Sequence, residues 1–433
     1  MEIKRDVYLD RLIVRKHNGL IKVITGIRRS GKSYLLNTLF YRHLIAENIS
    51  EDHIIKFAFD SAEDLLKIGE DPIVLDNEKE DRKVDPSKFI NWLMPQIKGD
   101  GMYYLLLDEV QKLGAFESVL NGFLRRENLD VYVTGSNSKF LSKDILTEFR
   151  GRGDEVHVLP LSFSEYYAFK QGDKSEAYDD YSVYGGLPAV ALMVTEEQKT
   201  NYLISQMQNL YLRDIVNRYA VQDETALGKV IDVIASGIST LTNPRKIANT
   251  MHTIHGTKTC NATVDRYIGY AEEAFILTRV KRYNVKGRKY IGTPYKIYFE
   301  DVGLRNVRLS FRQIEGTHMM ENIIYNELRY RGYQVDVGTV ESREKDSSGK
   351  EIRVQREIDF IASLGSKKYY IQSAYAIPDQ EKYEQETKSF EHTMDSFKKI
   401  IIIEKSMKPR YDEHGYLMMG VKEFLLDANS LLI

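Results

Sequence analysis

The stretch GIRRSGKS, residues 26–33, matches a glycine-rich pattern, G-x-x-x-x-G-K-[ST], whose residue types suit phosphate. Glycines let backbone N–H groups turn inward around phosphate oxygens, the lysine reaches the β- and γ-phosphates, and the last hydroxyl binds Mg²⁺. Lys32 and Ser33 take the last two of these roles. The residues predicted to surround ATP or ADP are Gly26, Ile27, Arg28, Arg29, Ser30, Gly31, Lys32, Ser33 and Tyr34.

Two adjacent carboxylates, Asp108 and Glu109, end the apolar run MYYLLLDEV at 102–110. We expect Asp108 to hold Mg²⁺ with Ser33 or through water, and Glu109 to orient and deprotonate an attacking water. A third run, LDVYVTGSNS at 129–138, ends in polar side chains, and Asn137 is the one predicted to act on the γ-phosphate or its water. Solvated turns at strand ends are the alternative for these polar groups.

The elements around these residues must bring them together. LIKVIT before the glycine loop predicts a buried strand and SYLLNTLFYRHL after it a helix, so phosphate would meet a helix N-terminus. Further apolar runs, HIIKFAF and DEVHVL, alternate with helical patterns through about residue 160. This alternation predicts a mostly parallel, three-layer α/β P-loop domain.

Bulk properties limit the class of protein. A chain of 433 residues predicts two to four domains, and a net charge of −2 with 29% charged residues indicates a soluble globular protein. The single cysteine, Cys260, excludes an intramolecular disulfide and a cysteine-rich zinc site. The start of the chain has no signal-peptide pattern, and its longest aliphatic run is far shorter than a membrane span. We therefore expect a cytoplasmic protein without a membrane partner.

Residues 225–300 show three helical patterns and then a basic hairpin. In the third helix Val264, Ile268, Ala271 and Phe275 are expected to form the buried stripe, which leaves Tyr267 and Tyr270 outward. From 274 to 299 there are cations and tyrosines but no acidic residue, which predicts a winged helix that binds nucleic acid, DNA in particular. A protein-docking winged helix is the alternative. The predicted contacts are Arg266, Arg282, Lys286, Arg288 and Lys289.

The chain resembles a group of AAA-superfamily ATPases, archaeal and bacterial, that carry a C-terminal restriction-endonuclease-like domain. The resemblance rests on GIRRSGKS, LLLDEVQK, VTGSNS, LPLSFSEY, YGGLPAV and YLRDIV in this order, and on FEDVGLRN, EIDFIA and YYIQSAY later. It implies an ATPase domain at 1–195, a helical lid at 196–232, a winged-helix module at 233–305 and the endonuclease-like domain at 306–433.

The resemblance also assigns residues. Arg152, with Arg150 as second choice, would reach the γ-phosphate of a neighbouring copy in a homo-oligomer, unless it only forms a surface ion pair. In the C-terminal domain Glu321, Asp359 and Gln372 match the nuclease positions, but Ala374 stands where the nuclease lysine is required. We therefore expect an ATPase coupled to DNA binding, with an inactive nuclease fold. A nucleotide switch that docks proteins and an ATP-dependent nuclease remain alternatives.

Overall fold

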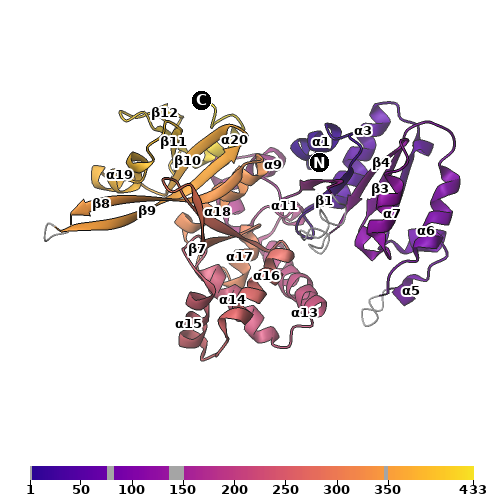
Figure 1. Ribbon diagram of the computed structural model, residues 1–433, viewed down its shortest axis with the longest axis horizontal. Coiled ribbons are helices and arrows are strands. Elements are labelled where there is room, and N and C mark those ends of the chain that lie inside the picture. Colours follow the sequence, from indigo (N-terminus) through magenta and orange to yellow (C-terminus); the bar gives the residue numbers. More distant parts are fainter. Residues whose placement is uncertain (1, 76–81, 136–150, 346–349) are drawn as a thin grey trace. The chain divides into compact units, whose positions relative to one another are not determined.

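The computed structural model describes residues 2–75, 82–135, 151–345 and 350–433. They divide into two compact units (Figure 1). The N-terminal unit contains residues 2–159 with 273–275, and the C-terminal unit contains 160–272 and 276–433. Among the described residues, no helix combines the length and the apolar character that crossing a bilayer requires.

The N-terminal unit is built on a parallel sheet with the strand order β2-β3-β4-β1-β5. All residues of β1, β3 and β4 are buried, as expected for central parallel strands that helices cover on both faces. In Figure 1, α1 and α3 lie on one face of this sheet and α6 and α7 on the other. The strands are β1 (Ile21–Thr25), β2 (Ile54–Ala58), β3 (Tyr103–Asp108), β4 (Leu129–Thr134) and β5 (Gly153–His157).

The helices of this unit confirm the predicted alternation of strand and helix. The helix after the glycine loop runs from Lys32 to Ala46 in three segments, of which the middle one, η1, is a π-helix. It buries Leu35, Leu36, Phe40 and Leu44. The helices are α1 (Asp6–Ile13), α2 (Lys32–Tyr34), η1 (Leu35–Phe40), α3 (Tyr41–Ala46), α4 (Ala62–Lys67), α5 (Pro72–Leu75), α6 (Pro86–Leu93) and α7 (Phe116–Phe123).

The C-terminal unit contains a mixed sheet with the order β12-β13-β11-β10-β9-β8-β6-β7. Its hairpin β6–β7 pairs in parallel with β8, from Arg282↔Val337 to Asn284↔Thr339. The predicted module 233–305 and the predicted domain 306–433 therefore share one sheet. The strands are β6 (Leu277–Asn284), β7 (Lys289–Phe299), β8 (Gln334–Lys345), β9 (Glu351–Leu364), β10 (Lys367–Ala374), β11 (Lys398–Ile403), β12 (Arg410–Tyr411) and β13 (Leu417–Gly420).

Three helices, α14, α15 and α16, precede this hairpin, as the sequence predicts. One detail of the prediction is wrong: Tyr267 is buried at 5% exposure, whereas Phe275 lies beyond the end of α16 with φ +55°. The helices are α9 (Phe163–Lys170), α10 (Lys174–Tyr184), α11 (Pro188–Leu192), α12 (Glu196–Ser205), η6 (Gln206–Leu212), α13 (Arg213–Tyr219), α14 (Glu224–Ser236), α15 (Pro244–His255), α16 (Asn261–Glu273), α17 (Val302–Arg308), α18 (Gly316–Tyr330), α19 (Gln380–Thr387) and α20 (Val421–Leu426).

Candidate functional site

The glycine loop links β1 to the helix that begins at Lys32. Gly26 has φ +132°, and a Cβ atom there would meet the carbonyl oxygen of Val158 at 2.1 Å, so only glycine fits. Gly31 caps the helix with φ +95°. The buried Lys32 Nζ donates to the carbonyl oxygens of Gly26 (2.9 Å) and Ile27 (3.0 Å). The loop thus curls around its own lysine, the residue expected to meet phosphate.

The other predicted loop residues differ in exposure. Ile27 and Ser30 are buried, Arg28 is half-buried, and Arg29 is exposed with φ +65°. Ser33 and Tyr34 are exposed in the first helical turn. In general the first backbone N–H groups of a helix have no carbonyl partner within the helix, and this property makes helix N-termini bind anions.

Asp108 ends β3 and is the meeting point of three elements. Its carboxylate accepts hydrogen bonds from the hydroxyl of Thr134 at the end of β4 and from the amide of Asn37 (3.1 Å), and the hydroxyl of Ser33 lies close enough to influence its pKa. Burial raises the pKa of Asp108, while the hydroxyls of Thr134 and Ser33 act in the opposite direction. Two oxygen donors, one an exposed hydroxyl and one a carboxylate, match the ligands that Mg²⁺ prefers.

Glu109 follows immediately with φ +50°, a left-handed conformation that redirects the chain out of the strand. Its backbone N–H donates to Thr134 Oγ1 at 3.1 Å, so one threonine contacts both Asp108 and the residue after it. The half-buried Glu109 carboxylate accepts a hydrogen bond from the amide of Gln111. Thr134, a polar residue at the end of the third predicted strand, therefore holds the acidic turn in shape.

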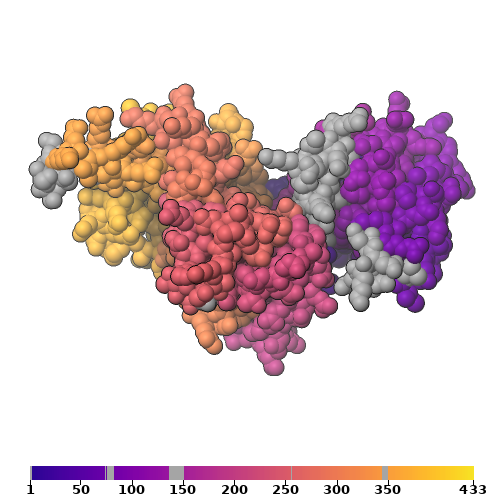
Figure 2. Space-filling model, turned by 60° about the horizontal axis from the view of Figure 1, so that its bottom comes forward, coloured from indigo at the N-terminus to yellow at the C-terminus, as the bar shows by residue number. Residues whose placement is uncertain are grey.

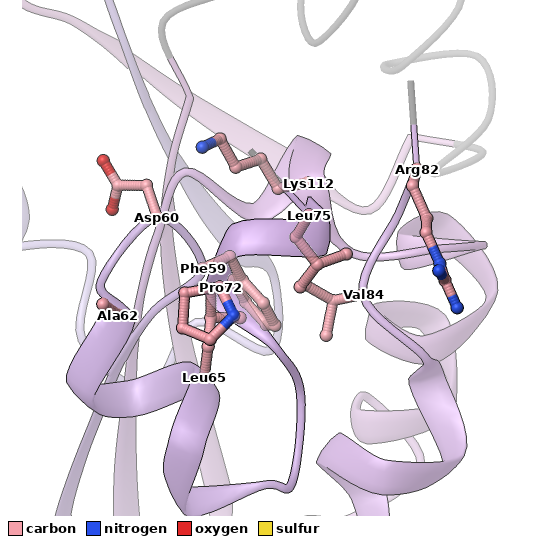
Figure 3. Close-up of a pocket in the computed structure, with 9 residues that line it drawn as sticks. All are labelled: Phe59, Asp60, Ala62, Leu65, Pro72, Leu75, Arg82, Val84 and Lys112. Carbon is pink, nitrogen blue, oxygen red and sulfur yellow. The ribbon is translucent and has the colours of Figure 1, made fainter. Parts of the chain in front are cut away.

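A third carboxylate, Asp60, lies near this pair and was not predicted. It follows β2, the strand next to β3, and burial together with the charges of Glu109 and Asp108 raises its pKa. Asp60 and Lys112 lie at the rim of a cavity of about 130 Å³, with Arg82 at another side (Figure 3). The signal was available in the sequence, because HIIKFAFD ends in an acidic residue at the same sheet edge as MYYLLLDE.

The remaining predicted residues of this unit have mixed outcomes. Asn137 and Arg150 lie outside the described residues, so their predicted roles stay predictions. The Arg152 side chain is exposed and forms no hydrogen bond or ion pair with any residue that the structure describes. Its backbone carbonyl accepts from Ile21 at 2.9 Å, which fixes the chain next to β1.

The predicted nuclease residues of the C-terminal unit do lie together, around a cation that was not predicted there. The fully buried Lys296 of β7 forms ion pairs with Glu321 of α18 (2.7 Å), Glu357 (2.7 Å) and Asp359 (3.1 Å) of β9. Gln372 accepts a bond from the Asp359 backbone N–H (3.4 Å). We call Lys296, Glu321, Glu357 and Asp359 the ammonium cluster.

Further bonds complete this cluster. Tyr298 donates to Glu321 at 2.6 Å, and Ser373 N–H donates to the second oxygen of Asp359 at 2.9 Å. Burial raises the pKa of Glu321 to about 7, against the lowering effect of Lys296. Within the part of the chain that the structure describes, no group of three or more His, Cys, Asp or Glu side chains is arranged to hold a metal ion. An ammonium group occupies the centre of the carboxylates.

The predicted nucleic-acid residues require one correction. Arg282 is buried at 7% exposure, and its guanidinium donates to the Pro294 carbonyl (3.0 Å) and to Gln355 (3.1 Å). Its guanidinium is therefore buried and already engaged, and it is not available to meet phosphate. Lys286, Arg288 and Lys289 are exposed at the hairpin turn, as predicted. Arg266 is exposed on α16.

Known proteins resemble this chain at the level of sequence and of fold. Residues 18–167 match the AAA domain family, and residues 175–315 match a domain of unknown function. An uncharacterized protein of Haemophilus influenzae is 34% identical over 410 residues, which cover 93% of this chain and 94% of that protein. An uncharacterized protein of Methanocaldococcus jannaschii is 26% identical over 98% of this chain and 89% of its own length.

A solved structure shares the fold. The Walker-type ATPase of Pyrococcus abyssi superposes with a TM-score of 0.50 at 14% identity, covering 71% of this chain and 96% of that one. This likeness agrees with the parallel sheet and the glycine loop described above. The chain therefore belongs to the same family as the uncharacterized Haemophilus influenzae protein, and its N-terminal unit is an AAA-superfamily domain with the P-loop ATPase fold.

Proposed function

We propose that the N-terminal unit binds ATP with Mg²⁺ and hydrolyses it, and that the nucleotide state controls binding of nucleic acid, DNA in particular, by the C-terminal unit. One observation supports the binding and hydrolysis of ATP. Asp108 accepts a hydrogen bond from Thr134 and lies near the Ser33 hydroxyl, directly beside a loop that encloses Lys32. The ends of β1, β3 and β4 thus converge in the way that a phosphate and its metal ion require.

Each residue has a separate role in this proposal. Lys32 would exchange its two carbonyl partners for phosphate oxygens, and Ser33 and Asp108 would hold Mg²⁺, which supplies charge neutralisation at the phosphates. Glu109 would take a proton from the attacking water, because its half-buried carboxylate follows Asp108 directly. Asp60, near both, adds negative charge to the same edge and favours a cation there.

Arg152 would act on the nucleotide of a neighbouring copy, in a homo-oligomer. Its exposed side chain has no partner among the described residues, which supports this role over the alternative of a surface ion pair. A guanidinium that reaches a γ-phosphate stabilises the charge that develops during phosphoryl transfer. The C-terminal unit would comprise a helical lid at 196–232, a winged-helix module at 233–305 and an endonuclease-like domain at 306–433 without nuclease activity.

The ammonium cluster supports the absence of nuclease activity. Nuclease chemistry of this type uses a divalent cation between carboxylates. Here Lys296 is in contact with all three carboxylates of the cluster, and Ala374 contributes no cation of its own. The residues present do not fit a metal ion as long as Lys296 stays in place.

The test is the ATPase rate of the full chain with Mg²⁺, measured alone and with single-stranded, duplex or branched DNA. The parent should hydrolyse ATP and respond to at least one DNA. Glu109→Gln should keep ATP bound but lose most of the hydrolysis, whereas Glu127→Gln should behave as the parent. Glu127 is a matched control because it is exposed and lies before β4, at the amino end of the sheet. Hydrolysis by Glu109→Gln at the parental rate would contradict the assigned base.

A further inference from the structure

Helix α15 is held firmly in the C-terminal unit. Asn243 caps it by accepting from the Lys246 backbone N–H at 2.9 Å, and Pro244 occupies the first helical position. Before the cap, Thr242 exchanges two backbone hydrogen bonds with Tyr295 of β7, at 2.8 and 2.9 Å. Its own residues Ile247, Ala248 and Met251 are buried on its inner face. The helix is therefore anchored to the unit at its N-terminal end and along its inner face.

The outward face of α15 is polar and cationic. It borders an open groove of about 460 Å³. Arg245 and Asn249 are exposed, and their side chains make no hydrogen bond or ion pair with any part of the chain that the structure describes. No acidic residue occurs from 233 to 264. The groove is lined by Asn243, Arg245, Lys246, Asn249, Thr250, Thr253 and Ile254. Segments that include α14 and α15 face the viewer in Figure 2 in pink to red.

The neighbouring helix α16 has the opposite charge. It carries Arg266 but also three carboxylates, Asp265, Glu272 and Glu273. Of these, Asp265 and Glu272 pair with Arg279 of β6. The ring of Tyr270 is stacked on that of Tyr219, with centroids 3.8 Å apart. Because α15 carries cations and no carboxylate, it is the better match of the two helices for a polyanion.

We propose that α15 reads base edges in the major groove of duplex DNA. This rests on the proposed binding of nucleic acid, and it names the element and the form of the ligand. Positions 245, 249 and 253 are four apart, so they form one row on the helix. The major groove of duplex DNA, about 12 Å wide, admits an α-helix. The twelve residues of α15 extend about 18 Å.

The side chains in this row are those that distinguish base pairs. Arginine makes paired hydrogen bonds to guanine, asparagine makes them to adenine, and threonine contacts either a base edge or the thymine methyl group. Lys246, one turn from Thr250, carries a charge suited to phosphate; its ammonium donates to the Leu241 carbonyl at 2.9 Å. The row thus supplies sequence discrimination, while the hairpin turn with Lys286, Arg288 and Lys289 supplies attraction without discrimination.

The experiment selects duplexes from a randomised library with the full chain, and then measures affinity for the selected duplex and for a mixed-sequence duplex. Arg245→Ala and Asn249→Ala should each reduce the preference for the selected duplex by about five- to 150-fold, the range for one lost bidentate contact. Arg266→Ala, at a predicted contact on α16, is the comparison variant: whatever its effect on affinity, it should change the binding of both duplexes alike and leave the preference unchanged. Alanine favours helix, so both variants should keep the parental unfolding temperature and DNA-free ATPase rate.

Five outcomes decide the proposal. Loss of preference in the α15 variants alone supports it. Unchanged preference in both α15 variants, or loss in Arg266→Ala instead, overturns it while leaving the proposed function intact. The proposal is also overturned if duplex binding is lost only when Lys286, Arg288 and Lys289 are replaced, while the α15 variants bind duplex like the parent. A parent that hydrolyses ATP but binds no duplex at any salt concentration refutes both this inference and the nucleic-acid part of the proposed function.

Discussion

Replacing Lys296 by methionine is expected to destabilise the C-terminal sheet strongly. Methionine keeps much of the side-chain volume but removes the ammonium group that contacts Glu321, Glu357 and Asp359. Removing one partner of a buried ion pair costs about 3–5 kcal/mol, because the remaining charge is left in a medium of low polarity. The free energy of local unfolding around the ammonium cluster should fall by that amount.

The loss should also depend on pH, with a sign that follows from Glu321. Its pKa in the fold, about 7, is above the usual glutamate value, so its contribution to stability is present at acid pH and declines as pH rises toward 7. Without Lys296, which lowers that pKa, the decline should extend above pH 7. For each proton involved, each pH unit adds about 1.4 kcal/mol to the destabilisation. The loss of stability caused by Lys296→Met should therefore be larger at pH 9 than at pH 7 by up to about 2.7 kcal/mol.

The assay is amide hydrogen exchange of peptides from β7, β9 and β10, with each variant compared with the parent at the same pH. Protection in Lys296→Met should fall by more than about a hundredfold, because 3 kcal/mol corresponds to over two powers of ten. Peptides from β1, β3 and β4 in the other unit should not change. Lys367→Met, at an exposed position at the start of β10, is the control. Adding Glu321→Gln to Lys296→Met should restore part of the protection. Equal protection of the parent and Lys296→Met would refute the reasoning.

Three further outcomes follow from the sites. Lys32→Ala should abolish nucleotide binding measured by calorimetry, whereas Arg152→Ala should bind nucleotide but hydrolyse it slowly. A mixture of the two variants should regain ATPase activity. Full ATPase activity of a strictly monomeric parent would contradict a role of Arg152 in trans. The protein with Mg²⁺ or Mn²⁺ should not cleave DNA above background, and cleavage that disappears in Asp359→Ala would show the opposite. Alanine in place of three turn cations should flatten the salt dependence of duplex binding by up to about 2.7 units of log K per log salt, since each lost phosphate contact removes about 0.9. Those cations are Lys286, Arg288 and Lys289.

Local patterns predict the N-terminal unit well. β1 and β3 are short, mostly apolar strands. Gly26 follows β1 and Asp108 ends β3, so their chemistry lies within a few residues of the strand. The sequence does not reveal contacts made over long separations. Lys296 and Arg282 look like members of one basic hairpin, yet both are buried. Lys296 meets carboxylates of α18 and β9, and Arg282 donates to Pro294 and Gln355. Whether a cation on a strand meets solvent or carboxylates depends on its neighbours in the sheet.

The pattern of α16 also shows that the sequence alone does not fix which residues are buried. A period of 3.6 predicts α16 correctly, but it assigns Phe275 to the buried stripe, although the helix ends before that residue and Tyr267 takes the buried position. The missing nuclease lysine at Ala374 is visible in the sequence, whereas the ammonium group supplied by Lys296 from another strand is not.

The shared sheet of the C-terminal unit has a consequence for any attempt to divide the chain. Val337, Gly338 and Thr339 of β8 pair with β6 on the side opposite β9. A fragment that begins at residue 306 would lack β6 and β7 and would therefore present unpaired N–H and C=O groups along β8. Exposed edges of this kind pair with other chains and cause aggregation. The same fragment would leave the carboxylates of Glu321, Glu357 and Asp359 without Lys296, so recombination during evolution should transfer residues 277–433 together.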